Sequence, residues 1–410
     1  MSAQAPSQPL PPPAAPPAGE PFSLPPFHAH IREQAEELAA RFTERSRDLR
    51  LHGLEHDEIH PELWEAFTEQ GWPGLLVPAF HGGTEGGLLG YAVVLEALAA
   101  ANLLLWMPVL STAIAHAIAV VGPDAAREQW LERVARGDTH LALAVTEPEV
   151  GHNVFRSQAT VAREADRFVV NGRKGVTSGI EMAERVLVLG RVPGEREQGA
   201  PPQFTTVLID PRAPGVTREE LPMRGREGVR QWQLELEDVE APLDAIVGAE
   251  GQGLLTLWPF THVERLLTAA LSLGSARYCV GRAVTRAGER SIFGTRPIGA
   301  EQAIQHPLAR LHSRIQATQL LVYRSAARFD AGVDQLALAG EANMAKMLAS
   351  DLLFDAADHA MQTLGATAWD EREGMIDVFL DARLSRSGPV SQELALNFIA
   401  QHVLGLPSHR

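Results

Sequence analysis

Three long helical patterns occupy the C-terminal part of this sequence and constrain its fold more than any other feature. Apolar residues recur there at helical spacing over stretches of 27–30 residues, at positions 264–290, 303–332 and 336–365. Helices in globular proteins are usually shorter, and helices of this length pack well side by side as an antiparallel bundle. We therefore predict a C-terminal helical bundle over residues 251–410.

A different pattern precedes the bundle. From about residue 140, short strand-like runs are separated by Gly, Pro, Asn and Asp: LALAVTE, RFVVNG, RVLVLGRV, FTTVLID and QWQLELEDVEAP. Runs of this length with such punctuation are typical of β-strands joined by turns. They predict a small β-domain over residues 140–250.

Upstream of the strands the pattern is again helical. HIREQAEELAARFTERSRDLR and IHPELWEAFTEQGW have apolar residues at helical spacing, which predicts an N-terminal helical domain over residues 28–139. The first 26 residues contain ten prolines, so residues 1–27 are predicted to be a disordered or polyproline-like tail. The order of helical, β and helical parts predicts an α+β fold.

Composition excludes several classes of protein. The formal net charge of −15 argues against nucleic acid as the main partner, because phosphate binding needs a basic surface. Cys279 is the only cysteine, which excludes an internal disulfide and a cysteine-rich metal site and fits a reducing cytoplasm. Only two lysines occur, Lys174 and Lys346, and we attach no function to their scarcity.

One apolar segment, residues 97–121, is long enough to cross a bilayer. Asn102, Thr112 and His116 interrupt it, and Pro108 is expected to break it near the middle. Two buried helices explain the segment better than a membrane span. The N-terminus lacks the basic and apolar regions of a secretory signal, so a cytoplasmic protein is expected.

Five further segments carry recognisable motifs. They are GLLVPAFHGGTEGGLLGYAVVLEALAAAN, LALAVTEPEVG, RFVVNGRKGVTSG, LELEDVEAPLDAIVGAEGQG and RSIFGTRPIGAEQAIQ. In this order and at these spacings they resemble segments of the acyl-CoA dehydrogenase family. The likeness covers nearly the whole chain after the proline-rich tail.

The resemblance implies a fold of an N-terminal α-helical domain, a central β-barrel-like domain and a C-terminal four-helix bundle. It implies FAD held between the β-domain, the bundle and a neighbouring subunit, and hence a homotetramer or homodimer. It further implies acyl-CoA thioesters as substrates. An electron-transfer flavoprotein would then accept the electrons.

Desaturating a thioester needs a base for the α-proton, a hydride acceptor facing Cβ and donors to the thioester oxygen. A flavin supplies the acceptor, and a carboxylate in a dry pocket supplies the base, because burial raises its pKa. In many family members the base is a glutamate near the C-terminus, but Pro389 occupies that position here. Isovaleryl-type members carry it on a bundle helix in a Glu-Arg pair, which Glu264–Arg265 matches without a gap. The resemblance therefore implies Glu264 as the base.

The sequence alone leaves a second interpretation of Glu264 open. A glutamate at the start of a helix is commonly exposed in the first turn, where the helix dipole favours it. Against this, Glu264 shares a helix face with Leu267, Thr268 and Leu271, a mostly apolar stripe. That stripe favours a buried carboxylate.

Other site residues are carried over from the resemblance. Arg265 matches an arginine beside the CoA or active-site entrance. His152 and His262 are expected near the substrate. No metal site is expected. The implied cofactor positions are Val145 and Thr146 at the flavin ring, Thr177 and Ser178 near its reactive edge, Arg290, Phe293 and Gln302 on the adenosine side from a neighbouring subunit, Gln362 and Gly365 in the Gln-x-x-Gly element, and Ser391 beside the pyrophosphate.

Several positions depart from the family pattern. Pro389 lacks the backbone N–H that would help to hold the thioester oxygen, and the loss of one such donor typically costs about 10²–10³ in rate. Ala366 replaces a glycine, and His152 and Asn153 replace a Ser-Asp pair. Two alternatives therefore stay open: a non-catalytic subunit of a hetero-oligomer, and a flavin oxidase or monooxygenase of the same fold.

Overall fold

The N-terminal part of the chain is helical. The computed structural model describes residues 23–151, 153–194, 201–225, 228–292 and 294–408. The first helix begins at Pro26, inside the predicted tail, because proline is favoured in a first helical turn, where its missing N–H is not needed. The helices of this part are α1 (Pro26–Phe42), α2 (Ser46–His56), α3 (Pro61–Glu69), α4 (Gly87–Ala100), α5 (Trp106–Val121) and α6 (Asp124–Arg136).

The apolar segment 97–121 contributes to two helices, but the break between them lies before Pro108. α4 ends at Ala100 and α5 begins at Trp106, so Pro108 belongs to the first turn of α5. The prediction that Pro108 breaks the segment is wrong, because a proline in a first turn removes no helical hydrogen bond. Among the residues that the structure describes, no helix combines the length and the apolar character of a membrane span.

The central part forms one sheet, which contains seven strands within the described residues. Its order is β1-β4-β2-β3-β7-β6, with β5 paired to β4. The sequence pattern did not indicate β2 or β6, and the side chains of β6 are mostly exposed, so no buried face marks it as a strand. The strands are β1 (Leu141–Ala144), β2 (Thr160–Arg163), β3 (Arg167–Ser178), β4 (Arg185–Arg191), β5 (Phe204–Ile209), β6 (Val216–Leu221) and β7 (Gln231–Pro242).

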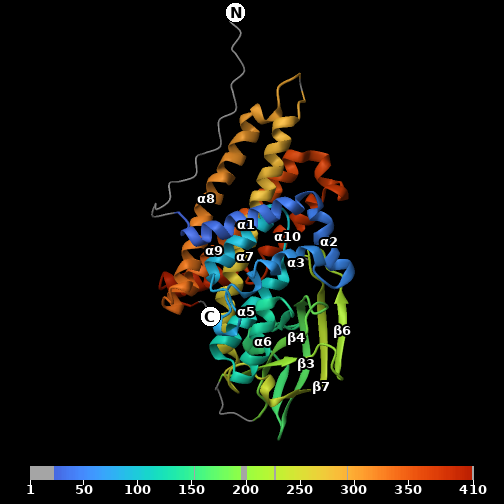
Figure 1. Ribbon diagram of the computed structural model, residues 1–410, viewed down its shortest axis with the longest axis vertical. Coiled ribbons are helices and arrows are strands. Elements are labelled where there is room, and N and C mark those ends of the chain that lie inside the picture. The colour runs from blue at the N-terminus through green and yellow to red at the C-terminus, as the bar shows by residue number, and fades with distance from the viewer. Residues whose placement is uncertain (1–22, 152, 195–200, 226–227, 293, 409–410) are drawn as a thin grey trace, which may run out of the picture.

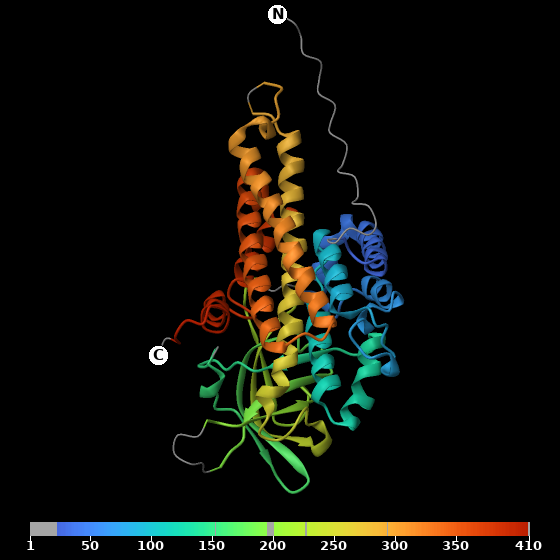
Figure 2. The same cartoon turned by 90° about the vertical axis from the view of Figure 1, so that its left-hand side faces the viewer.

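The C-terminal part is a helical bundle, which rises from the sheet with the N-terminal helices packed beside it (Figures 1 and 2). Its longest helix begins at Gly253, so Glu264 lies about three turns inside it and is not a first-turn residue. The helices of the bundle are α7 (Gly253–Glu289), α8 (Gln302–Asp330), α9 (Gln335–Leu364), α10 (Met375–Ser385) and α11 (Gln392–Phe398).

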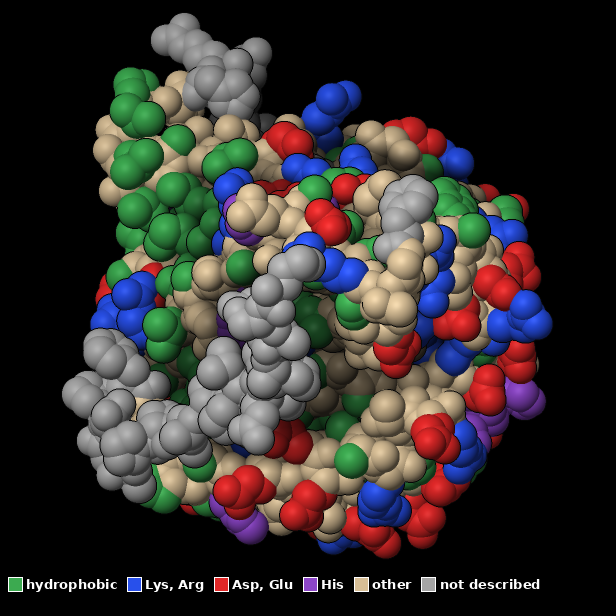
Figure 3. All heavy atoms as spheres, turned by 90° about the horizontal axis from the view of Figure 1, so that it is seen from above, with side chains coloured by type: hydrophobic (Ala, Val, Ile, Leu, Met, Phe, Trp, Pro, Cys, Tyr) green, Lys and Arg blue, Asp and Glu red, His purple; other side chains and the backbone are tan. Residues whose placement is uncertain are grey.

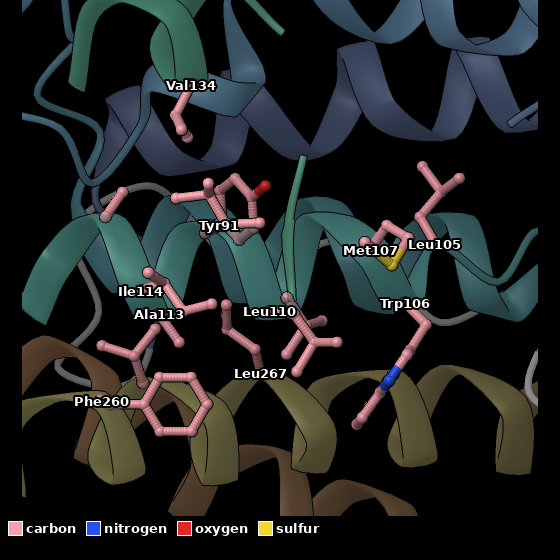
Figure 4. Close-up of a cluster of buried hydrophobic side chains, with 14 of the residues drawn as sticks. Tyr91, Leu105, Trp106, Met107, Leu110, Ala113, Ile114, Val134, Phe260 and Leu267 are labelled. Carbon is pink, nitrogen blue, oxygen red and sulfur yellow. The ribbon is translucent and has the colours of Figure 1, made fainter. Parts of the chain in front are cut away.

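α7 joins two hydrophobic cores. The core around its first half is formed with the N-terminal helices, the sheet and parts of α8 and α9, whereas the core around its second half is formed with α8, α9 and α10. Figure 4 shows Leu110 and Ile114 of α5 lying against Phe260 and Leu267 of α7. The helix that carries Glu264 is therefore fixed from several sides.

Close approach of α4 to α7 depends on one glycine. A Cβ added at Gly274 would collide with the carbonyl oxygen of Glu96 in α4 and crowd the side chain of Ala99. Only glycine lacks this atom, so the two helices can pack with their backbones almost in contact at this point.

Truncation of a core side chain of α7 tests this packing. Leu267 is fully buried, so Leu267→Ala should lower the free energy of unfolding by about 2–5 kcal/mol, through lost burial and a residual cavity. Leu255 of the same helix is 63% exposed, and Leu255→Ala should change the free energy of unfolding by no more than about 0.5 kcal/mol. Urea unfolding of both variants measures the difference, and equal losses would contradict the proposed core.

Candidate functional site

Glu264 lies on the buried face of α7. Only 8% of its surface is exposed, and Val263, Leu266 and Leu267 around it are fully buried. Desolvation by burial raises the pKa of the Glu264 carboxyl to about 7, although the charges of Arg265 and Lys346 act in the opposite direction. The interpretation of Glu264 as an exposed residue of a first turn is therefore wrong. A carboxyl group with this pKa can take up and release a proton near neutral pH.

Arg265 follows Glu264 and is half-buried. Burial lowers the pKa of its guanidinium, against the attraction of the Glu264 carboxylate. Its Nε atom is buried without a hydrogen-bond partner among the described residues. A buried guanidinium N–H normally has a partner, so this atom could donate to a bound anion or carbonyl.

Lys346 of α9 is the second cation near Glu264. Its side chain is fully buried, and Nζ donates to the carbonyl oxygens of Ser385 and Val390, the latter at 2.8 Å. These two carbonyls bracket the turn that contains Pro389 and leads to Ser391, the N-cap of α11. One lysine therefore holds this turn and contributes positive charge near the candidate base.

The predicted flavin-ring residues lie together where β1 and β3 end. The Gly175 N–H donates to the Thr146 carbonyl at 3.0 Å, which ties the two segments to each other. Ser178 donates to the Gln231 side chain at 2.7 Å, whereas Thr177 Oγ1 is buried with no hydrogen-bond partner among the described residues. A polar ligand atom at this place would satisfy Thr177.

A buried ion pair supports this region, and sequence reasoning missed it. Lys174 Nζ donates to the Val145 carbonyl and to Glu147 Oε1, both at 2.9 Å. Burial raises the pKa of Glu147, but hydrogen bonds from the Gln158 N–H and from Lys174 outweigh it and leave the pKa below its ordinary value. Burial lowers the pKa of Lys174, and Glu147 opposes that shift. The signal in the sequence was the scarcity of lysine: both lysines are fully buried.

Four other predicted cofactor residues lie far from the sheet. Arg290 and Gln302 flank the turn from α7 to α8, at the end of the bundle remote from the sheet (Figure 2). Gln362 and Gly365 mark the end of α9, which runs antiparallel to α8 and so returns to the same end. The helical rise from Glu264 to Arg290 is about 40 Å. One chain therefore does not bring these residues to Thr177.

The predicted substrate residues have different surroundings. Both ring nitrogens of His262 face backbone carbonyl oxygens, those of Trp258 at 2.7 Å and of Gln335 at 3.1 Å. Burial lowers the pKa of His262. These contacts connect α7 to the start of α9 and leave no ring nitrogen for a substrate, which favours a structural role. His152 and Phe293 lie outside the described residues.

The buried carboxyl group makes stability depend on pH. The pKa of Glu264 is about 7 in the folded protein against an ordinary 4.5, so between these values the unfolded chain binds fewer protons and stability falls as pH rises. Relative to Glu264→Gln, the wild type should lose about 3 kcal/mol of unfolding free energy from pH 4.5 to pH 8. Urea unfolding across this range measures it, and a constant difference would contradict the raised pKa.

The Lys174–Glu147 pair is tested by breaking it in two ways. Lys174→Met leaves a buried carboxylate without its cation and should lower the free energy of unfolding by about 3–5 kcal/mol. Adding Glu147→Gln should recover part of that loss. The exposed pair Arg173–Glu149 provides the control, because Arg173→Met should cost about 1 kcal/mol or less. Urea unfolding measures these losses. If Lys174→Met loses as much stability alone as it does together with Glu147→Gln, the pairing is refuted.

Three family models match the chain. Residues 26–138 match the N-terminal domain of acyl-CoA dehydrogenase, residues 142–239 its middle domain and residues 251–404 its C-terminal domain. Acyl-CoA dehydrogenase FadE12 of Mycobacterium tuberculosis is 36% identical over 347 residues, which are 84% of this chain and 88% of that protein.

Solved structures show the same fold. A glutaryl-CoA dehydrogenase in complex with glutaryl-CoA has a TM-score of 0.84 at 23% identity, over 95% of this chain and 98% of the other. An FAD complex of PigA has a TM-score of 0.83 at 22% identity, over 94% and 100%. The predicted fold class and the predicted oxidoreductase class are confirmed, and FAD is the cofactor of this family. On the match to FadE12 and to all three domain models, the chain belongs to the acyl-CoA dehydrogenase family.

Proposed function

We propose that this chain is an FAD-dependent acyl-CoA dehydrogenase in which Glu264 removes the α-proton of an acyl-CoA thioester. The observation that carries the proposal is the burial of Glu264, which raises the pKa of its carboxyl to about 7. A base is most effective when its pKa lies near the working pH, and an exposed glutamate would be too weak. The position on α7 agrees with the Glu-Arg pair of isovaleryl-type members.

The charges around Glu264 suit this role. Burial alone would keep the carboxyl protonated, but the positive charges of Arg265 and Lys346 lower its pKa and keep the ionised form accessible. The partnerless Nε of Arg265 is available to a polar group of the substrate, in agreement with the predicted place of Arg265 at the CoA side. Lys346 belongs to the same site through the turn that contains Pro389.

Val145, Thr146, Thr177 and Ser178 are the residues that would hold the flavin ring. The partnerless Thr177 Oγ1 fits this role, since a flavin edge carries polar atoms that could bond it. When bound, FAD supplies the hydride acceptor for the β-carbon. The Lys174–Glu147 pair would fix the backbone of both flavin-side segments.

A second copy of the chain completes the proposed cofactor site. Arg290, Gln302, Gln362 and Gly365 lie at the remote end of the bundle, so they can reach FAD only on a neighbouring subunit, whereas Ser391 lies near Lys346. A homodimer or homotetramer is therefore part of the proposal. Hydrophobic side chains gather along one edge of the molecule seen from above the bundle (Figure 3), and exposed ones in the C-terminal segment are Leu394, Leu396, Val403, Leu404 and Leu406. Such patches favour an interface.

An electron-transfer flavoprotein is the proposed electron acceptor, and a cytoplasmic location is part of the same proposal. Pro389, which removes a possible donor to the thioester oxygen, favours the competing possibility of a non-catalytic subunit. Production of peroxide after flavin reduction would instead indicate an oxidase.

Replacement of the base tests the proposal. The purified protein should be yellow, and acyl-CoAs from a panel of chain lengths and branching should bleach its flavin. The Glu264→Gln variant should retain FAD, but an acyl-CoA should reduce its flavin about 10²–10⁴-fold more slowly than that of the wild type. Glu219→Gln, on the exposed edge strand β6, is the control and should react like the wild type. Colourless protein that acquires flavin only with a partner, or a fully active Glu264→Gln variant, would overturn the proposal.

The pH profile gives a second test. Glu264 must be ionised to accept a proton, so the rate of flavin reduction by a saturating acyl-CoA should rise with pH and level off above a midpoint near 7. Stopped-flow absorbance of the flavin measures this rate. A rate that is flat from pH 5 to pH 9 would exclude Glu264 as the base.

A further inference from the structure

A pocket follows the face of α7 that carries Glu264. Thr268 and Leu271, one and two turns beyond Glu264, line it together with residues from the start of α5, from α9 and from α10. The full lining is Leu104, Trp106, Thr268, Leu271, Ser272, Ser275, Leu353 and Asp381. If Glu264 faces the α-carbon, the distal part of the acyl chain would extend into this pocket.

Three polar groups of this lining have no hydrogen-bond partner among the described residues. The hydroxyls of Ser272 and Ser275 and the indole N–H of Trp106 make no hydrogen bond within the part of the chain that the structure describes. These residues are only 3%, 7% and 5% exposed. Figure 4 shows Trp106 pointing from the start of α5 toward α7. Their polar atoms open into the pocket, so a polar group of a ligand bound there could form hydrogen bonds with all three.

Thr268 shows that a hydroxyl group in this helix can form a hydrogen bond with the helix backbone. Its hydroxyl donates to the Glu264 carbonyl at 2.7 Å, which is the usual arrangement for a hydroxyl inside a helix. Ser272 and Ser275 have carbonyls at the same spacing but do not use them. Their hydroxyls stay available to the pocket.

The charges at the pocket argue for a neutral ligand group. Asp381 contributes the only charged side chain of the lining, and the guanidinium of Arg50, which also bonds Asn102 at 3.0 Å, pairs with it. No lysine or arginine belongs to the lining. Since Arg50 is already paired with Asp381, a carboxylate in this pocket would be buried without a cation of its own, which is costly.

We infer that the substrate is an acyl-CoA whose acyl chain carries a neutral oxygen substituent, a hydroxyl or an oxo group, that is bound by Ser272, Ser275 and Trp106. The inference rests on the proposed function. The helical rise from Glu264 is about 12 Å to Ser272 and about 16 Å to Ser275. The substituent thus lies on the distal part of the chain, away from the two carbons that react. Leu104, Leu271 and Leu353 contact the apolar carbons between them.

Binding to the inactive holoprotein Glu264→Gln tests this without turnover. Calorimetry compares saturated acyl-CoAs of four to twelve carbons with counterparts that carry a hydroxyl, an oxo group or a terminal carboxylate. A hydroxyl or oxo compound should bind at least about tenfold more tightly than its parent, and the carboxylates should bind more weakly. Comparison of the hydroxyl compounds with the oxo compounds decides which substituent the pocket prefers.

A second set of variants assigns the preference to the pocket. Adding Ser272→Ala and Ser275→Ala should remove the preference and leave affinity for the saturated parents unchanged. Ser313→Ala is the control, because Ser313 is exposed on α8 and bonds its own helix. In the protein with Glu264 intact, the rates of flavin reduction by the same compounds, measured by stopped flow, should follow the same order as their affinities.

The outcomes separate this inference from the proposed function. Equal binding of saturated and substituted compounds, or a preference that survives both serine replacements, would overturn the inference while the dehydrogenase activity stands. Binding of no acyl-CoA, with no flavin bleaching in the wild type, would overturn the proposed function and this inference with it.

Discussion

The passage of α7 through two hydrophobic cores is the interaction on which the rest of this structure depends. Its first half is packed by the N-terminal helices, the sheet and parts of α8 and α9, and its second half by α8, α9 and α10. Glu264, on the buried face of this helix, is largely removed from water, and desolvation raises the pKa of its carboxyl group. The same packing brings β5 of the sheet, α10 and the polar pocket alongside one helix.

Both lysines are buried, and they lie in two different places. Lys174 and Glu147 pair next to the proposed flavin-side segments, and Lys346 holds the turn between α10 and α11 while its charge acts on Glu264. A lysine is costly to bury unless carbonyls or a carboxylate satisfy its three donors. Both lysines have such partners, which fits a role in fixing backbone around a site rather than in solubility.

Much of the fold could be predicted from local pattern. The long apolar stripes indicated α8 and α9, and the strand-like runs indicated β1, β3, β4, β5 and β7. The start of α7 could not be predicted, because Pro259 interrupts the pattern and yet lies inside the helix. For the site, the face shared by Glu264, Leu267 and Leu271 was visible, but the partners of Lys174 and the unpaired hydroxyl of Ser272 were not.

The sequence by itself determined the order of helical and β parts, the family motifs and the Glu-Arg pair, because these depend on residues close together in the chain. Tertiary structure alone decided that Glu264 is buried, that Lys346 lies near it and that Arg50 pairs with Asp381. The physical reason is that desolvation and pairing depend on neighbours from distant segments. Residue spacing along the chain does not indicate which distant segments supply these neighbours.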